Sequence, residues 1–176
     1  FTGPQGFGIA NMADALYAIK KLVFEEKSVS MQEYKEALEN NYGKDMDAKA
    51  AESVTAQVAK SLVESGKMLS REDVQTIYET VVKNNCTDEQ KQRYERLLNK
   101  IGELPKFGND IPEVDEFARD VAYTYTKPML KYRNPRGGQY QAGLYPVSAN
   151  VPLGAQTGAT PDGRLANTPV ADGVSP

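Results

Sequence analysis

Reactive side chains are scarce in this sequence. Its 176 residues include no histidine and a single cysteine, Cys86. Without histidine, the chain by itself cannot form a Ser-His-Asp or Cys-His catalytic group, and most types of zinc site are excluded. One cysteine cannot form an internal disulfide, which fits a reducing compartment. Cys86 lies between Asn85 and Thr87 in a polar turn, and we interpret it as an incidental thiol.

The charged residues with possible chemistry have simpler structural interpretations. Asp115, Glu116, Arg119 and Asp120 lie together at helical spacing, which is typical of a solvated helix face rather than of catalytic carboxylates. Arg136 precedes two glycines and could bind an anion, although we favour a plain loop. The net charge of −3, with both signs mixed, gives no electrostatic footprint for nucleic acid.

The last quarter of the chain is nearly uncharged and rich in glycine and proline. After Arg136, the charged residues are only Asp162, Arg164 and Asp172. Such a segment is too apolar for a flexible tail, so we expect it to be buried inside something larger than these 176 residues. If Arg164 is buried, it needs a carboxylate, a backbone carbonyl or a partner chain, and we favour a structural anchor over a substrate contact.

Local patterns predict the elements that must position these residues. Apolar spacing, capping boxes that begin at Ser30 and Thr87, and glycines such as Gly66 predict helices over about 9–25, 31–41 and 48–65. Two further helices begin at Ser70 and Thr87 and carry apolar residues to Val82 and Ile101, and another runs from Asp110, as N-cap, to near Thr126. We expect Pro128 to kink or end that last helix. Alternation of apolar residues from Tyr140 onward predicts a strand over 142–147, followed by a buried loop over 150–154.

Three blocks of sequence carry a resemblance to a known family. They lie in one order along the chain: Phe1-Thr-Gly-Pro-Gln-Gly-Phe-Gly-Ile-Ala-Asn-Met12, Lys106-Phe-Gly-Asn-Asp110, and Gly143-Leu-Tyr-Pro-Val-Ser-Ala-Asn-Val-Pro-Leu-Gly154 with Pro161-Asp-Gly-Arg164 and Ala171-Asp-Gly-Val-Ser-Pro176. Together they resemble the C-terminal half of a glycyl radical enzyme of the pyruvate formate-lyase-like superfamily. The closest branch holds the choline trimethylamine-lyases and the glycerol and propanediol dehydratases, and the choline lyases resemble the chain most.

This resemblance implies a fragment of a ten-stranded α/β barrel. We expect loop and helices of the barrel domain over 1–44, a helical surface subdomain over 45–105, and a helix, a barrel strand and buried loops over 106–176. The family's catalytic cysteine, in a Gly-Cys-x-Glu context, would lie upstream of residue 1. The radical glycine would lie downstream of residue 176, so the fragment alone is predicted to be inactive.

The resemblance also implies the site residues, cofactors and partners. Tyr145 and Val147 would line the substrate cavity, with simple barrel packing as the alternative. The parent would cleave choline to trimethylamine and acetaldehyde or, alternatively, dehydrate glycerol or 1,2-propanediol. A radical-SAM activase with an iron–sulfur cluster would install the glycyl radical, and no cofactor or metal is expected on this chain.

Further expectations concern the oligomeric state, location and partners of the full-length parent. We expect a homodimer in the bacterial cytoplasm, either free or inside a microcompartment, without nucleic acid or membrane partners. No apolar run approaches the roughly 18–20 residues that span a bilayer. The alternative from a different class is a non-catalytic helical interaction module. The nearly uncharged C-terminal stretch argues against it, because that stretch would be a large sticky surface if exposed.

Overall fold

The computed structural model describes residues 2–66, 68–85, 87–146 and 148–172, with the backbone alone for 82–85. Helices dominate these residues. The α-helices are α1 (Ile9–Ile19), α2 (Met31–Glu39), α3 (Met46–Ser65), α4 (Arg71–Asn85), α5 (Asp88–Glu103), α6 (Pro112–Met129) and α7 (Asn150–Ala155). A π-helix, η1 (Lys20–Glu25), continues α1, and a 3₁₀ turn, η2 (Asn41–Gly43), follows α2.

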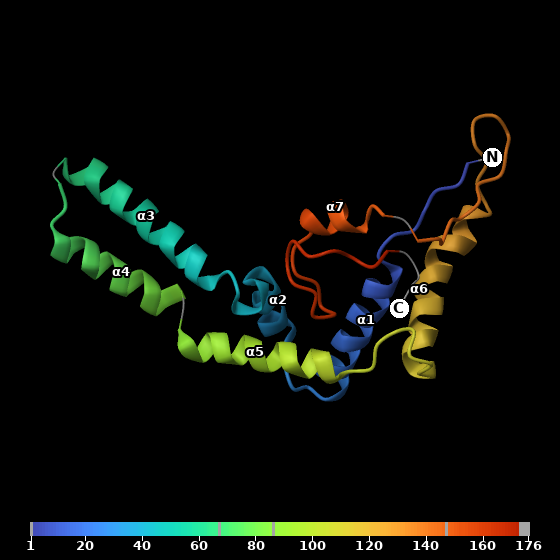
Figure 1. Cartoon of the computed structure of the whole chain (residues 1–176), viewed down its shortest axis with the longest axis horizontal. Coiled ribbons are helices and arrows are strands. Elements are labelled where there is room, and N and C mark those ends of the chain that lie inside the picture. The colour runs from blue at the N-terminus through green and yellow to red at the C-terminus, as the bar shows by residue number, and fades with distance from the viewer. Residues whose placement is uncertain (1, 67, 86, 147, 173–176) are drawn as a thin grey trace.

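The helices form an elongated arrangement (Figure 1). At one end α1 packs along α6, and at the other α3 and α4 pack on each other as a hairpin that extends away from the rest. Helices α2 and α5 lie between these two ends, and α7 and the C-terminal loop lie beside them. Within the described ranges, no helix is both long and apolar enough to cross a membrane.

The main core joins the end of α1, η1, α2, η2, the start of α3 and α5. Tyr34, Leu22 and Ile101 are each at most 1% exposed, and Leu165 packs against this cluster from the C-terminal loop. Fully burying one such apolar side chain contributes about 1.5–3 kcal/mol relative to leaving it exposed. The C-terminal loop is therefore part of this core rather than a loose extension.

Local helix signals in the sequence are mostly confirmed. Ser30 accepts a hydrogen bond from the amide of Glu33 at 3.1 Å, and Thr87 forms a complete capping box with Gln90. Gly66 closes α3 with a φ of 63°. The reciprocal half of the Ser30 box does not appear among the described bonds of α2, and the Glu33 carboxylate lies 3.6 Å from the Arg93 guanidinium instead.

Two predictions about the helix 112–129 are wrong. Asp110 is not its N-cap: Asp110 has a φ of 57° within a turn, and Ile111 takes the cap position before Pro112. The helix also passes Thr126 and ends at Met129. Pro128 lies in the last turn, where it cannot donate to the carbonyl four residues earlier, and the helix ends one residue after it.

The predicted strand over 142–147 is also wrong for the residues that the structure describes. Thr2 with Tyr140 and Gln5 with Gly143 form isolated parallel bridges, and no strand or barrel is formed in the described part of the chain. The amides of Gln141 and Gly143 donate to the carbonyls of Thr2 and Pro4, at 3.0 and 2.8 Å. The ladder breaks where Pro4, which has no N–H, would have to donate back.

The stretch 150–154, expected as a buried loop, forms most of the short helix α7. Its Pro152 fits the first helical turn, where an amide donor is not needed. Val151 and Leu153 are 56% and 43% exposed, so only Gly154 of this helix is buried. The expected division of the chain at residues 45 and 106 stays a prediction.

Candidate functional site

The segment that carries Tyr145 lies along the N-terminal segment. The Gly6 amide donates to the Gly143 carbonyl at 3.0 Å, which extends the pairing of Thr2 and Pro4 with this segment. Beyond it, the Gln5 side-chain amide donates to the Tyr145 carbonyl at 2.6 Å. The Tyr145 side chain is 55% exposed. The backbone of Tyr145 is therefore held in place, while its side chain remains largely exposed among the described residues.

Gly143 leaves room for the Tyr145 ring. A Cβ at position 143 would lie 2.7 Å from Cε1 of Tyr145, closer than such atoms approach in proteins. A second phenol is held nearby, because the Tyr125 hydroxyl donates to the Pro4 carbonyl. Burial raises the pKa of Tyr125, and the neighbouring Tyr145 raises it further. The Tyr125 phenol therefore stays protonated, and remains a donor, near neutral pH.

Two residues singled out from the sequence lie outside the described residues. They are Val147, predicted to line the cavity with Tyr145, and Cys86. Of the two predicted cavity residues, Tyr145 is thus the one whose surroundings the structure describes.

Arg164 is a structural anchor within the described contacts, as the sequence suggested. Its guanidinium donates to the carbonyls of Thr168 at 2.6 Å and Leu165 at 3.0 Å, and also to that of Gly158. Its Nε lies 3.1 Å from the Thr160 hydroxyl. Five fixed donors suit this role, because the loop turns back around a single planar group.

The turn Pro161–Arg164 is held by side chains that are distant in sequence. Tyr34 and Tyr42 donate to the carbonyls of Pro161 and Thr160, at 2.6 and 2.8 Å. Burial raises the pKa of both phenols, so they remain donors. Asn11 donates to an Asp162 carboxylate oxygen at 2.6 Å, and Lys106 donates to the Asp162 carbonyl at 2.9 Å.

Asn41 adds a further contact, because its Oδ1 accepts the Ala166 amide at 2.8 Å. Asn41 and Tyr42 both have a φ of 51°, in the left-handed region that costs roughly 1–2 kcal/mol per residue. This backbone conformation places both side chains on the loop. The sequence offers no signal for it beyond the Tyr42-Gly43 helix end.

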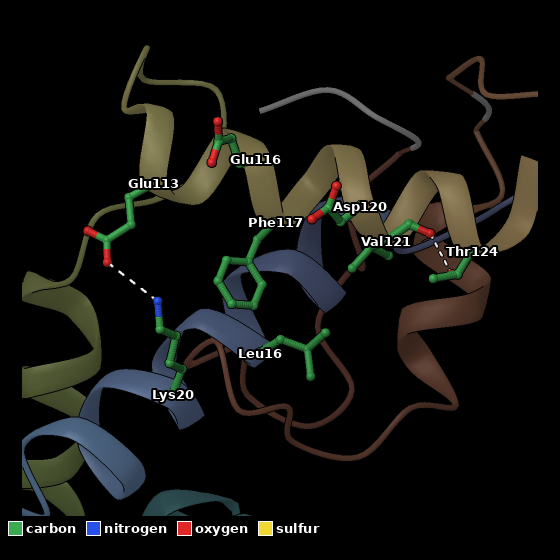
Figure 2. Close-up of a pocket in the computed structure, with 8 residues that line it drawn as sticks. All are labelled: Leu16, Lys20, Glu113, Glu116, Phe117, Asp120, Val121 and Thr124. Carbon is green, nitrogen blue, oxygen red and sulfur yellow. Dashed lines mark hydrogen bonds and ion pairs between the residues drawn. The ribbon is translucent and has the colours of Figure 1, made fainter.

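A groove between α1 and α6 combines an apolar floor with a charged rim (Figure 2). Phe117, Leu16 and Val121 form the floor, and Lys20 lies 5.3 Å from the centre of the Phe117 ring. Glu113 on the rim is paired with Lys21 at 3.3 Å. The Tyr17 hydroxyl and Lys21 hold the pKa of Glu113 below its usual value, so this carboxylate is unsuited to donating a proton near neutral pH.

Two of the remaining carboxylates on α6, Glu116 and Asp120, form a mixed-charge face with Arg119, as expected, whereas Asp115 accepts the Gly108 amide at 3.1 Å. Arg119 lies 4.0 Å from Glu116 and 3.4 Å from Asp120. The turn at Arg136 also behaves as a plain loop. Asn134 Oδ1 accepts the amides of Arg136 and Gly138 at 3.0 and 2.9 Å, so these donors are not available to an anion.

In the described residues no group of three or more His, Cys, Asp or Glu side chains could hold a metal ion. The described residues include an exposed tyrosine, Tyr145, whose backbone carbonyl accepts a hydrogen bond from Gln5. They also include a C-terminal loop that polar contacts connect to α1, α2 and the connection after α5. This arrangement can line and shape a cavity, and the described residues supply no nucleophile–base pair for chemistry of their own.

Comparison with known proteins shows the family. Residues 1–154 match the family model described as pyruvate formate lyase-like. The chain therefore belongs to the pyruvate formate-lyase-like family of glycyl radical enzymes, as its motifs suggested.

Several individual members of this family are similar to the chain over nearly its whole length. A solved structure concerned with 1,2-propanediol dehydration in Roseburia inulinivorans is 55% identical, with a TM-score of 0.74, over 100% of this chain and 17% of that one. The glycerol-bound, B12-independent glycerol dehydratase of Clostridium butyricum is 36% identical, with a TM-score of 0.65, over 97% of this chain and 15% of that one. A probable dehydratase of Escherichia coli K12, YbiW, is 35% identical over 96% of this chain and 16% of its own length.

The chain thus spans about a sixth of the length of these relatives. Other relatives include a trans-4-hydroxy-L-proline dehydratase and a (2S)-3-sulfopropanediol dehydratase, beside an indoleacetate decarboxylase and an isethionate sulfite-lyase. The similarity to several dehydratases favours the dehydratase alternative over the choline lyase, to which none of these relatives points specifically.

Proposed function

We propose that this chain is part of a glycyl radical dehydratase that acts on a small vicinal diol, 1,2-propanediol or glycerol. The observation that carries the proposal is the 55% identity over the whole chain to the protein studied for 1,2-propanediol dehydration. The block around Tyr145 lies inside this similarity. Dehydration of such a diol removes water and leaves an aldehyde, with no external oxidant or reductant.

In this proposal the chain supplies part of the cavity wall. A phenol can donate one hydrogen bond and accept others, which suits a substrate hydroxyl. Tyr145 offers such a group on a backbone fixed by Gln5, with its ring packed over Gly143. Val147 would add an apolar surface next to it. A radical intermediate needs a dry pocket without competing partners, and these two residue types are suitable walls.

The reactive groups of the parent lie outside these residues in our proposal. A glycyl radical, installed by a separate radical-SAM iron–sulfur activase, would supply the hydrogen-atom abstraction through a cysteine upstream of residue 1. The chain by itself would be inactive, and the parent would be a homodimer. The place of the cysteine is inferred from the family resemblance and from the lack of a Gly-Cys-x-Glu segment in these 176 residues. The activase, the radical glycine and the homodimer are proposed from the family resemblance alone.

The test is a product assay with the full-length protein and its activase under anaerobic conditions. We expect propanal from 1,2-propanediol or 3-hydroxypropanal from glycerol. Trimethylamine from choline, without aldehyde from either diol, would overturn the proposal in favour of the choline lyase. A protein that forms no glycyl radical and no product would instead support the non-catalytic helical module.

A pair of variants tests the role of Tyr145. Tyr145→Phe removes one hydrogen bond to substrate, and we expect kcat/KM to fall by about tenfold, which corresponds to roughly 1.4 kcal/mol. Tyr132→Phe is the matched control, because Tyr132 is similarly exposed, at 61%. Equal kinetics for both variants would show that Tyr145 does not contact the substrate through its hydroxyl.

A further inference from the structure

The N-terminal segment sets the register of the Tyr145 segment. Thr2 and Pro4 accept the amides of Gln141 and Gly143, and the Gly6 amide donates to the Gly143 carbonyl. Gly6 itself packs closely on Tyr125, since a Cβ there would lie 3.1 Å from that ring. Two residues further on, Gly8 adopts a φ of 69° and leads the chain into α1.

Because the chain turns into α1 at Gly8, the pairing with the N-terminal segment supplies no backbone donor to the Tyr145 carbonyl. In a parallel pairing with this register, the next donor after Gly6 would be the amide of residue 8. Gly8 has already turned away as the N-cap of α1. The Gln5 side chain replaces this donor, with Nε2 at 2.6 Å from the Tyr145 carbonyl oxygen. On the other side of Tyr145, Pro146 has no N–H and cannot support the segment by donating.

We propose that Gln5 is a positioning residue for the substrate cavity, acting through the Tyr145 carbonyl to fix the direction in which the Tyr145 ring is presented. This inference rests on the proposed function for its kinetic part. Within the Phe-Thr-Gly-Pro-Gln block, Gln5 can donate a side-chain hydrogen bond to the Tyr145 carbonyl, which neither glycine nor Pro4 can do. Gly6 and Gly143 leave room for the Tyr125 and Tyr145 rings, whereas Gln5 adds one contact beyond the point where Gly8 leaves the pairing.

Substitutions at Gln5 separate the hydrogen bond from the volume of the side chain. Gln5→Met keeps the length and removes the donor. Gln5→Lys keeps a donor of sufficient reach and should restore the contact. Gln32→Met is the matched control, because Gln32 donates to Glu36 at 2.8 Å on the exposed face of α2, away from this segment.

Each variant of the full-length protein is measured in two ways. Hydrogen exchange of peptides covering 140–146 reports whether the segment is held, without any substrate. Steady-state kinetics with 1,2-propanediol and with glycerol follows, and the glycyl radical content from electron paramagnetic resonance normalises kcat. For Gln5→Met we expect exchange at 140–146 to be about five- to tenfold faster and KM to rise by about five- to tenfold. The normalised kcat should change by less than about twofold.

The two measurements distinguish a failure of the positioning role from a failure of the proposed function. If exchange at 140–146 is the same in Gln5→Met, Gln5→Lys and Gln32→Met, the positioning role is overturned, whatever the enzyme does. If exchange rises in Gln5→Met alone but neither diol is converted by the wild type, the positioning contact stands and the proposed function fails. If exchange rises while KM for both diols stays unchanged, Gln5 holds the segment but does not position a substrate contact, and the proposal is wrong.

Discussion

Replacing Asn11 with aspartate should release the C-terminal loop in a pH-dependent way. The Asn11 amide connects two points of that loop: Nδ2 donates to Asp162 at 2.6 Å, and Oδ1 accepts the Ala171 amide at 2.6 Å. Asn11→Asp keeps the acceptor for Ala171 but loses the donor. It also places a second carboxylate against Asp162, in surroundings that already include Asp14 and Lys106.

The free energy lost from the contact between Asn11 and the C-terminal loop can be bounded. Losing a hydrogen bond to a charged group costs about 1.5–3 kcal/mol. Two full charges about 3 Å apart would repel by roughly 5–6 kcal/mol at an effective dielectric constant of about 20. The pair can avoid that cost by binding one proton, and protonating an aspartate of ordinary pKa near 3.9 at pH 7 costs about 4 kcal/mol. The loop contact should therefore weaken by about 1.5–4 kcal/mol at pH 7.

The direction in which loop docking depends on pH follows from the proton that the carboxylate pair takes up. The new carboxyl has a raised pKa while the loop is docked and an ordinary pKa when it is released. Its penalty is therefore greatest at neutral pH and fades as the pH falls toward about 4. At pH 5 the protonation cost is only about 1.5 kcal/mol. Asn11→Ala removes both hydrogen bonds without adding charge, so its defect should be nearly the same at pH 5 and pH 7.

Hydrogen exchange of peptides covering 157–171 in the full-length protein measures the release locally. Relative to wild type at the same pH, we expect Asn11→Asp to exchange about tenfold to several hundredfold faster at pH 7, and clearly less so at pH 5. Asn109→Asp is a control for added charge, because Asn109 is exposed and its side chain donates to the nearby Lys106 carbonyl. Wild-type protection in Asn11→Asp, or an equal defect at both pH values, would refute the bridging role of Asn11.

Three other predictions follow from the same contacts. Gly143→Ala should displace the Tyr145 ring from its close contact, and diol turnover should fall by about tenfold or more while the glycyl radical content is unchanged; wild-type turnover would show that the contact is not needed. Arg164→Lys should weaken the loop by about 2–3 kcal/mol, seen as faster exchange over 157–168, because a lysine cannot reach several carbonyls at once. The Tyr17 hydroxyl and Lys21 lower the pKa of Glu113, so the contacts of Glu113 with α1 and η1 should contribute their full stability above the ordinary pKa of a glutamate and lose it as the pH falls through the lowered value. A carbon-detected NMR titration that gives an ordinary pKa for Glu113 would contradict this.

The helices were predictable because their signals are local. Ser30, Thr87 and Gly66 act within a few residues of the helix ends that they mark, so their roles could be read from spacing alone. The errors at Asp110 and Pro128 concern one turn of helix each. The left-handed Gly108 and Asp110 shift the cap position by one residue to Ile111, and the helix continues one residue past Pro128 instead of ending before it.

The strand and the site depended on partners far away in the sequence. The alternation around Tyr140 is real, but its pairing partner is the segment at Thr2, and Pro4 interrupts that pairing. Likewise, the sequence indicated that Arg164 would be an anchor but not that Asn11 and Tyr42 hold the same loop. Those residues lie 151 and 118 positions away from their hydrogen-bonding partners. Only the family motifs hinted that these blocks come together.

The most direct test of the central claim is a single competition assay. The full-length protein, activated anaerobically until its glycyl radical is detected, is given equal amounts of 1,2-propanediol, glycerol and choline, and the products are quantified together. Our account predicts that propanal or 3-hydroxypropanal forms and that trimethylamine does not. Trimethylamine as the main product, or a fully activated protein that converts neither diol, would contradict it.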